Sequence, residues 1–117
     1  MSRDSRLFLD DIVESCEMLV RFVDGTTLES FRADERTTAA VERRIFIIGE
    51  AVKNLPDSLR AAHPEIQWRS IARLRDLLAH VYFQVDREIL WNVARSDVPV
   101  LLAQMRAILA AEFPDRG

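Results

Sequence analysis

The sequence contains very little cysteine, glycine or proline. Its 117 residues include one cysteine, three glycines and four prolines. Because a lone cysteine has no partner within the chain, an internal disulfide is excluded, and we expect a protein of the reducing cytoplasm. Alanine, leucine, arginine and glutamate are plentiful instead, and these residues favour helices. The composition therefore predicts an all-α protein, in which Cys16 falls on an apolar stripe and is interpreted as a small core residue.

Long apolar runs are also absent. No stretch reaches the length of a membrane span, and the first six residues carry several charges, so we expect neither an anchor nor a signal peptide. Hydrophobic residues make up 49% of the chain and charged residues 30%, with both signs interspersed. Such a chain can bury a core, and its length allows one domain. We therefore predict a single folded domain over residues 1–117 that does not contact membranes.

An excess of positive charge is missing too. The formal net charge is −3 at pH 7, which argues against a protein that coats nucleic acids through many phosphate contacts. The same charge leaves room for an enzyme that binds RNA at one local basic site.

The motifs that hold common cofactors and metals do not occur. There is no glycine-rich phosphate loop, no cysteine pair and no HExxH sequence. The two histidines, His63 and His80, do not form a ligand set with zinc spacing. His63 is interpreted as a polar residue at a helix end. We therefore expect no metal and no cofactor.

Apolar residues recur at three- and four-residue steps along most of the chain, which predicts helices. We expect long helices over 4–24, over 35–54, from 68 onward and over 86–111, with short helical turns after 26 and over 56–63. Gly25 supplies a stop signal, and Thr26 or Thr27 and then Asp86 supply caps. The prediction is an all-α, up-and-down bundle of four to five helices.

Pro99 interrupts the last of these helices. Its ring would clash with the carbonyl of Arg95, so we expect a kink there. Asp97 falls on the apolar stripe just before the proline, and we interpret it as a local cap at the kink.

Residues 45–48, Ile-Phe-Ile-Ile, are apolar on every side of one helical turn. A surface helix usually keeps a polar face, so this turn needs cover on two sides. Either a central position in the bundle or contact with a partner chain would supply that cover, and both remain open. Gly49 follows, and because glycine costs about 1 kcal/mol relative to alanine in a helix interior, it suggests that a neighbouring backbone approaches closely there.

The stretch from 68 to 84 carries residues that suit catalysis. On a helix its polar and apolar residues fall on nearly opposite stripes, Arg69, Arg73, Asp76 and His80 against Ile71, Leu74, Leu78 and Val81. Asp76 lies one turn before His80, so its carboxylate can hold the imidazole and favour its protonated form. Arg75 points about 140° away from His80 on a straight helix. These two side chains can meet only if the helix ends between them, or if two chains each bring a copy to a shared cleft.

Arginine and histidine together suit the cleavage of RNA without a metal. RNA carries its own nucleophile, the 2′-hydroxyl, so an enzyme needs only to move protons and stabilise charge. A histidine can act as general base or acid near neutral pH, and an arginine can hold the scissile phosphate and its extra charge in the transition state. The products would be a 2′,3′-cyclic phosphate and a 5′-hydroxyl. On composition alone, however, such a stripe is most often a solvated helix face.

The residues from Arg75 to Tyr82 form an R-x4-H-x-Y motif, and Ile48-Gly49-Glu50-Ala51 precedes it. In this order the two motifs resemble those of the HepT-like toxins of the HEPN superfamily. The resemblance covers nearly the whole chain, with further similar residues at positions 63–66, 68, 71, 82–86, 91, 97 and 99.

The resemblance implies a HEPN-like bundle that forms a homodimer, with two R-x4-H motifs at a common cleft. It implies a ribonuclease toxin with Arg75 and His80 as catalytic residues and Asp76 in support. It also implies a partner antitoxin, a minimal nucleotidyltransferase (MNT) that neutralises such toxins by adenylylating Tyr82. An AMP group would add bulk and negative charge two residues from His80 and so repel a phosphate substrate. The alternative role of Tyr82 is an amphipathic ring packed on the bundle.

Asp76 departs from the family pattern, because the residue after the motif arginine is often asparagine. Its carboxylate could orient His80, or it could pair with Arg73 or Arg75 and weaken phosphate binding. The alternative function for the whole chain is a non-catalytic helical interaction module, which binds and regulates a nucleotidyltransferase without cutting RNA.

Overall fold

The computed structural model describes residues 3–79 and 86–114, and within these ranges it contains helices and no strand. The elements in chain order are α1 (Arg3–Val23), α2 (Leu28–Ala33), α3 (Glu35–Lys53), α4 (Asp57–Ala62), α5 (Trp68–Ala79), α6 (Arg87–Asn92), the π-helix η1 (Val93–Asp97) and α7 (Val98–Glu112). The prediction of an all-α protein is confirmed. No helix in the described ranges is both long enough and apolar enough to cross a membrane.

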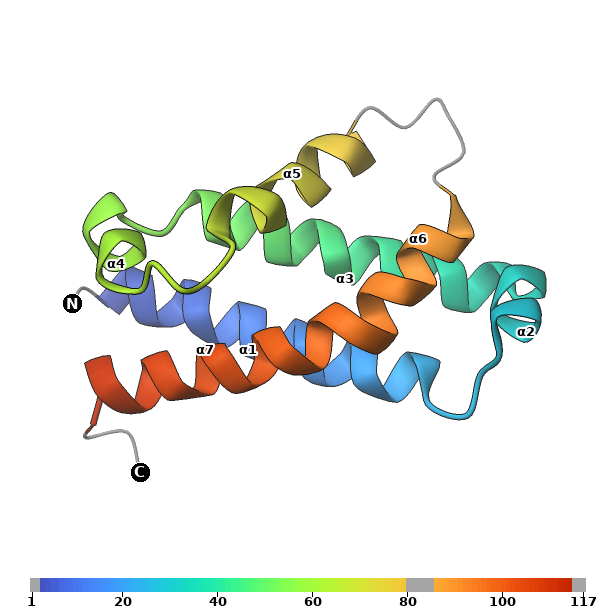
Figure 1. Ribbon diagram of the computed structural model, residues 1–117, viewed down its shortest axis with the longest axis horizontal. Helices are drawn as coiled ribbons and strands as arrows, with labels where there is room; N and C mark the ends of the chain where they lie inside the picture. Colours follow the sequence, from blue (N-terminus) through green and yellow to red (C-terminus); the bar gives the residue numbers. More distant parts are fainter. Residues whose placement is uncertain (1–2, 80–85, 115–117) are drawn as a thin grey trace.

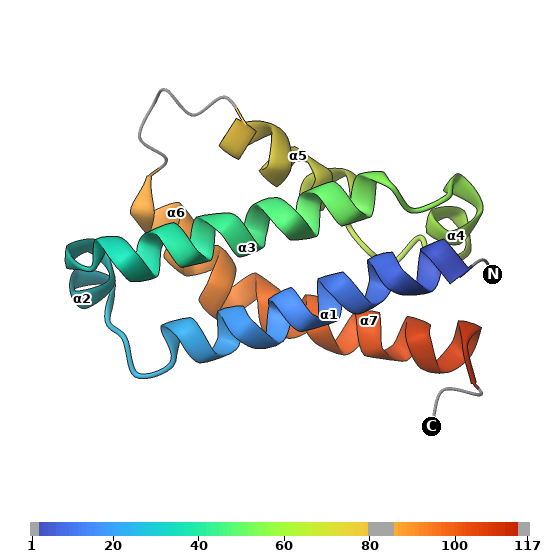
Figure 2. The ribbon, with the colours of Figure 1, turned by 180° about the vertical axis from the view of Figure 1, so that it is seen from behind.

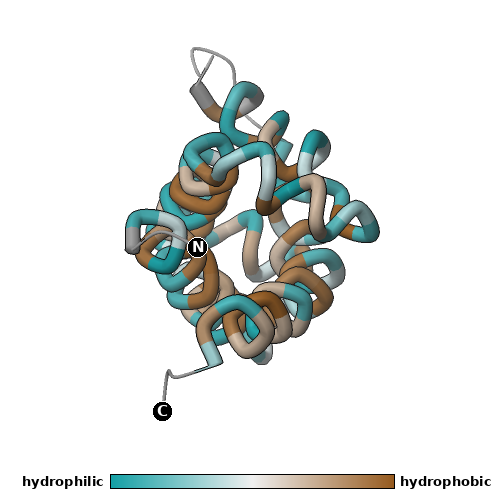
Figure 3. The backbone as a smooth tube through the Cα atoms, turned by 90° about the vertical axis from the view of Figure 1, so that its left-hand side faces the viewer, coloured by the Kyte–Doolittle hydropathy of each residue, from teal (hydrophilic) through white to brown (hydrophobic). Residues whose placement is uncertain are grey.

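The long elements run up and down in the order of the chain. α1, α3, α5 and the continuous run α6–η1–α7 alternate in direction, and the start of α1 and the end of α7 lie at the same end of the bundle (Figure 1). The opposite view shows α1 lying between α3 and α7 (Figure 2), both of which it contacts. Viewed from the end, the long helices surround the centre, and each alternates hydrophobic and hydrophilic segments along its turns (Figure 3). The predicted up-and-down helical bundle is confirmed.

The helix ends follow the predicted signals. Gly25 has a left-handed φ of 72°, which glycine adopts without strain, and it ends the first helix. Thr27, rather than Thr26, caps α2, because its hydroxyl accepts from the backbone N–H of Ser30. Asp86 caps α6 by accepting from the N–H of Glu88 at 2.8 Å. Local side chains therefore place the boundaries of these helices.

The first helix buries its predicted stripe completely. Its five core residues, Leu9, Ile12, Cys16, Leu19 and Val23, are each at most 3% exposed. Burial raises the pKa of the Cys16 thiol to about 12, so the thiol stays protonated near neutral pH and is not a nucleophile. Cys16 is a core residue, as predicted.

α3 lies in the middle of the bundle, with α1 on one side and α5 on the other. Ile45 and Ile48 are almost completely buried, and Phe46 and Ile47 are half-buried. A central position therefore accounts for most of this apolar turn, while contact with a partner chain remains a prediction. The close approach expected at Gly49 is confirmed, because a Cβ added there would lie 2.5 Å from the Cβ of Arg75 on α5.

The interpretation of Asp97 as a cap is wrong. Residues 93–97 form a π-helix, in which the N–H of Val98 donates to the carbonyl of Val93. This wider turn inserts one extra residue just before Pro99, and it accommodates the proline without breaking the helix. Because the backbone remains helical through Asp97, no free N–H needs its carboxylate, and no capping bond forms.

Candidate functional site

Arg75 projects from α5 toward α3. Its Nε donates to Oε2 of Glu50 at 2.7 Å, and its Nη1 lies 3.4 Å from Oδ1 of Asp76. The guanidinium carbon also lies 5.7 Å from the centre of the Phe46 ring, within the range of a cation–π contact. The side chain is still 33% exposed. Arg75 is therefore held in one orientation, yet a ligand can reach it.

Glu50 is a site residue that the sequence reasoning missed. It sets the orientation of Arg75, and it is the main cause that raises the pKa of that guanidinium. Phe46, Glu50 and Lys53 recur at four- and three-residue steps along α3, which places them on one face of the helix. All three contact Arg75 or Asp76 across the helix interface. Glu50 could have been identified from that spacing and from its position as the first acidic residue after the apolar turn.

Asp76 bridges two cations. Its Oδ1 accepts from Nζ of Lys53 at 2.6 Å and lies near Nη1 of Arg75. The hydrogen bond from Lys53 is the main cause that lowers the pKa of Asp76, so the carboxylate is ionised at neutral pH. Pairing with Arg75 was one of the predicted alternatives, whereas Lys53 was not foreseen as a partner. Arg73, the other predicted partner, is exposed and does not pair with Asp76 in the described part of the chain.

The cluster of Glu50, Lys53, Arg75 and Asp76 balances two positive charges with two negative charges. Glu50 accepts a hydrogen bond from Nε of Arg75, and Asp76 accepts only a long hydrogen bond from Nη1. Within the ranges that the structure describes, the remaining N–H groups of Arg75 have no hydrogen-bond partner. A guanidinium held on one side in this way can offer its other N–H groups to a phosphate.

Two of the four predicted site residues, Arg75 and Asp76, lie together. The other two, His80 and Tyr82, lie outside the described residues, so the roles predicted for them remain predictions. The predicted contact between Asp76 and His80 likewise remains a prediction.

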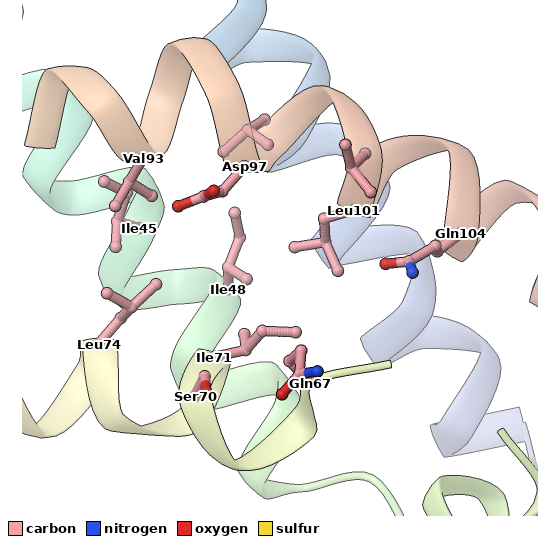
Figure 4. A pocket seen from close by; sticks show the side chains of 12 residues that line it. Ile45, Ile48, Gln67, Ser70, Ile71, Leu74, Val93, Asp97, Leu101 and Gln104 are labelled. Carbon is pink, nitrogen blue, oxygen red and sulfur yellow. The ribbon is translucent and has the colours of Figure 1, made fainter. Parts of the chain in front are cut away.

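A separate groove of about 370 Å³ runs between α5 and the η1–α7 segment, with Ile45 and Ile48 of α3 among its lining residues. Its walls are mainly apolar, and the carboxylate of Asp97 points into it (Figure 4). Ile71 and Leu74, part of the predicted core stripe of α5, are only half-buried because they line this groove.

Comparison with known proteins identifies the family. The model of the family described as ribonuclease HepT-like matches residues 12–108. A protein of Thermococcus cleftensis named "Probable ribonuclease HepT" is 44% identical over 101 residues, which cover 86% of this chain and 92% of that protein. "Putative RNase MJ0127" of Methanocaldococcus jannaschii is 38% identical over 107 residues, covering 92% and 88% of the two chains. No solved structure matches the chain. With its R-x4-H-x-Y motif and with these matches along nearly its whole length, the chain belongs to the ribonuclease HepT-like family.

Proposed function

We propose that this protein is a ribonuclease that acts as the toxin of a HepT/MNT-type toxin–antitoxin system in the cytoplasm. The observation that carries the proposal is the state of Arg75, which is oriented by Glu50 and remains one third exposed. This arginine opens the R-x4-H motif, and relatives that match over most of their length are named as ribonucleases. A phosphate-binding guanidinium at that position fits RNA as the substrate.

The proposed reaction uses the 2′-hydroxyl of RNA and no metal ion. His80 takes the proton of the 2′-hydroxyl, the 2′-oxygen bonds to phosphorus, and the bond from phosphorus to the 5′-oxygen breaks. The 5′-oxygen leaves with a proton supplied by a general acid, a second histidine or water. Arg75 stabilises the additional negative charge on the phosphoryl oxygens in the transition state. The products are a 2′,3′-cyclic phosphate and a 5′-hydroxyl.

We further propose that the active form is a homodimer. If α5 continued straight to His80, that residue would point about 140° away from Arg75, and one chain could bring both to a common phosphate only if the helix ended between them. Two chains that share a cleft would bring an Arg75 and a His80 to the same phosphodiester. The half-buried Ile47 of α3 leaves apolar surface that such an interface could use.

The test is RNA cleavage by the purified protein in buffer that contains EDTA. We expect the wild type to cut RNA, and we expect His80→Ala, folded equally well by circular dichroism, to lose cleavage. The second candidate function, an interaction module that binds a nucleotidyltransferase without catalysis, is favoured by the pairing of Arg75 with two carboxylates. That function predicts that neither the wild type nor His80→Ala cleaves RNA. Cleavage by the wild type and by His80→Ala at equal rates would mean that His80 is not catalytic.

Tyr82 is the proposed site of neutralisation by the MNT antitoxin. It is the only tyrosine in the chain and lies two residues after His80. Incubation with a nucleotidyltransferase and ATP is expected to add one or more AMP groups to the wild type and none to Tyr82→Phe, as measured by intact-protein mass spectrometry. The same treatment should abolish cleavage by the wild type only. Equal AMP addition to Tyr82→Phe would place the modification elsewhere.

A further inference from the structure

The ring of Phe46 lies close to two arginines from different helices. The guanidinium carbon of Arg75 is 5.7 Å from the ring centre, and that of Arg43 is 5.8 Å from the same centre. The two guanidinium groups are therefore no further apart than these two distances together. Arg43 is exposed and Phe46 is half-buried, so both can be reached from solvent.

Arg43 stands on the face of α3 that forms the site. It lies seven positions before Glu50, which is two helical turns, or about 10 Å along the axis. Phe46 lies between them at a three-residue and then a four-residue step. The face that orients Arg75 therefore continues past Phe46 and ends in a second cation.

The charge on Arg43 differs from the other charges of this face in one respect. Arg75 and Lys53 are paired with the carboxylates of Glu50 and Asp76. Arg43 has no carboxylate partner in the part of the chain that the structure describes, and its contact there is with the Phe46 ring. An exposed guanidinium that is aligned by a ring and not neutralised is suited to bind a phosphate.

We propose that Arg43 and Phe46 form a subsite for single-stranded RNA beside Arg75. Arg43 binds a phosphate next to the one held at Arg75, and Phe46 keeps the two guanidinium groups in register. The short distance between these groups suits consecutive phosphates of one flexible strand, since protein sites for single strands combine cations along the backbone with aromatic rings. The inference rests on the proposed ribonuclease function and adds to it the form of the substrate.

The test measures binding of a fluorescent 2′-O-methyl oligonucleotide by anisotropy, because this strand has no free 2′-hydroxyl and cannot be cleaved. Affinity is measured from about 50 mM to about 1 M salt, where each phosphate contact to a single strand contributes about 0.7 to the slope of log K against log salt. Arg43→Ala should reduce the magnitude of that slope by about 0.7. Its loss of affinity relative to the wild type should therefore be about eightfold larger at the lowest salt than at the highest. Phe46→Leu should weaken binding roughly threefold without changing the slope, since it removes a ring and no charge.

Arg21→Ala is the matched control, because Arg21 is an exposed arginine on α1, away from α5. It should leave both the slope and the affinity close to the wild-type values. The inference is overturned if Arg43→Ala has the wild-type slope, if Arg21→Ala lowers the slope equally, or if the wild type does not bind the strand. If binding does not depend on Arg43 while the protein cleaves RNA normally, the subsite is wrong and the proposed ribonuclease function stands. If binding depends on Arg43 but the wild-type protein does not cleave RNA, the proposed catalysis is wrong and the binding subsite stands.

Discussion

Replacing Arg75 with alanine is expected to slow RNA cleavage by roughly a hundredfold or more, the usual effect of removing one group that stabilises transition-state charge. The side chain is partly exposed and packs on Phe46, so the fold should survive the change. The measurement is the single-turnover rate on a short RNA, with circular dichroism to confirm helix content. A folded Arg75→Ala protein that keeps half of the wild-type rate would show that this arginine is not catalytic.

Two further variants separate the roles of charge and orientation. Arg75→Lys keeps the positive charge but loses the planar fork that binds both Glu50 and a phosphate, so it should recover little of the rate. Glu50→Gln keeps the shape of the residue that orients Arg75 but removes a negative charge near the substrate. The weaker hold on Arg75 should lower kcat. The loss of a negative charge near the substrate should leave KM unchanged or lower. A purely structural role for Glu50 predicts instead a fall in stability with kcat unchanged per folded molecule.

Gly49→Ala is expected to destabilise the protein by roughly 1–3 kcal/mol, the usual cost of overpacking. The added Cβ would lie 2.5 Å from the Cβ and 2.9 Å from the backbone nitrogen of Arg75, and neither atom can move without shifting α5. The gain in helix propensity, about 1 kcal/mol, offsets only part of this cost. Thermal unfolding should show a midpoint lower by roughly 4–12 °C. Because α5 carries Arg75, cleavage by the folded fraction should fall as well.

Gly25→Ala is the matched control for that experiment. Gly25 has a φ of 72°, and nothing lies within 4 Å of a Cβ added there. Alanine at this position should cost about 1 kcal/mol through backbone strain, and it should leave cleavage by the folded protein unchanged. If Gly49→Ala were as stable and as active as the wild type, the contact between α3 and α5 would have to be looser than described.

The helices and their ends could be predicted because they depend on short stretches of sequence. The apolar stripe through Cys16, the left-handed turn at Gly25 and the cap at Thr27 are each set by residues within one or two turns. Gly49 predicted its contact for a similar reason, since a glycine inside a helix has a cost that a close neighbour can explain.

The pairs that form the site could not be predicted from local patterns. Glu50 and Arg75 are 25 residues apart in the sequence. Their contact therefore depends on the axial position and the rotation of α5 relative to α3, which local patterns do not set. The same is true of Lys53 and Asp76, which are 23 residues apart. The cap role of Asp97 was predicted wrongly because the sequence around Pro99 does not show whether a new helix starts there, with a capping side chain, or one helix continues through a π-helical turn.

We propose that Arg75 and His80 cleave RNA through its own 2′-hydroxyl. The most direct measurement is to identify the ends of the fragments that the wild-type protein produces from a defined RNA in EDTA. This reaction yields a 2′,3′-cyclic phosphate at one end and a 5′-hydroxyl at the other, and it yields no fragments from an RNA with 2′-O-methyl groups throughout. Fragments with 5′-phosphate ends, or cutting of the 2′-O-methyl strand, would contradict it.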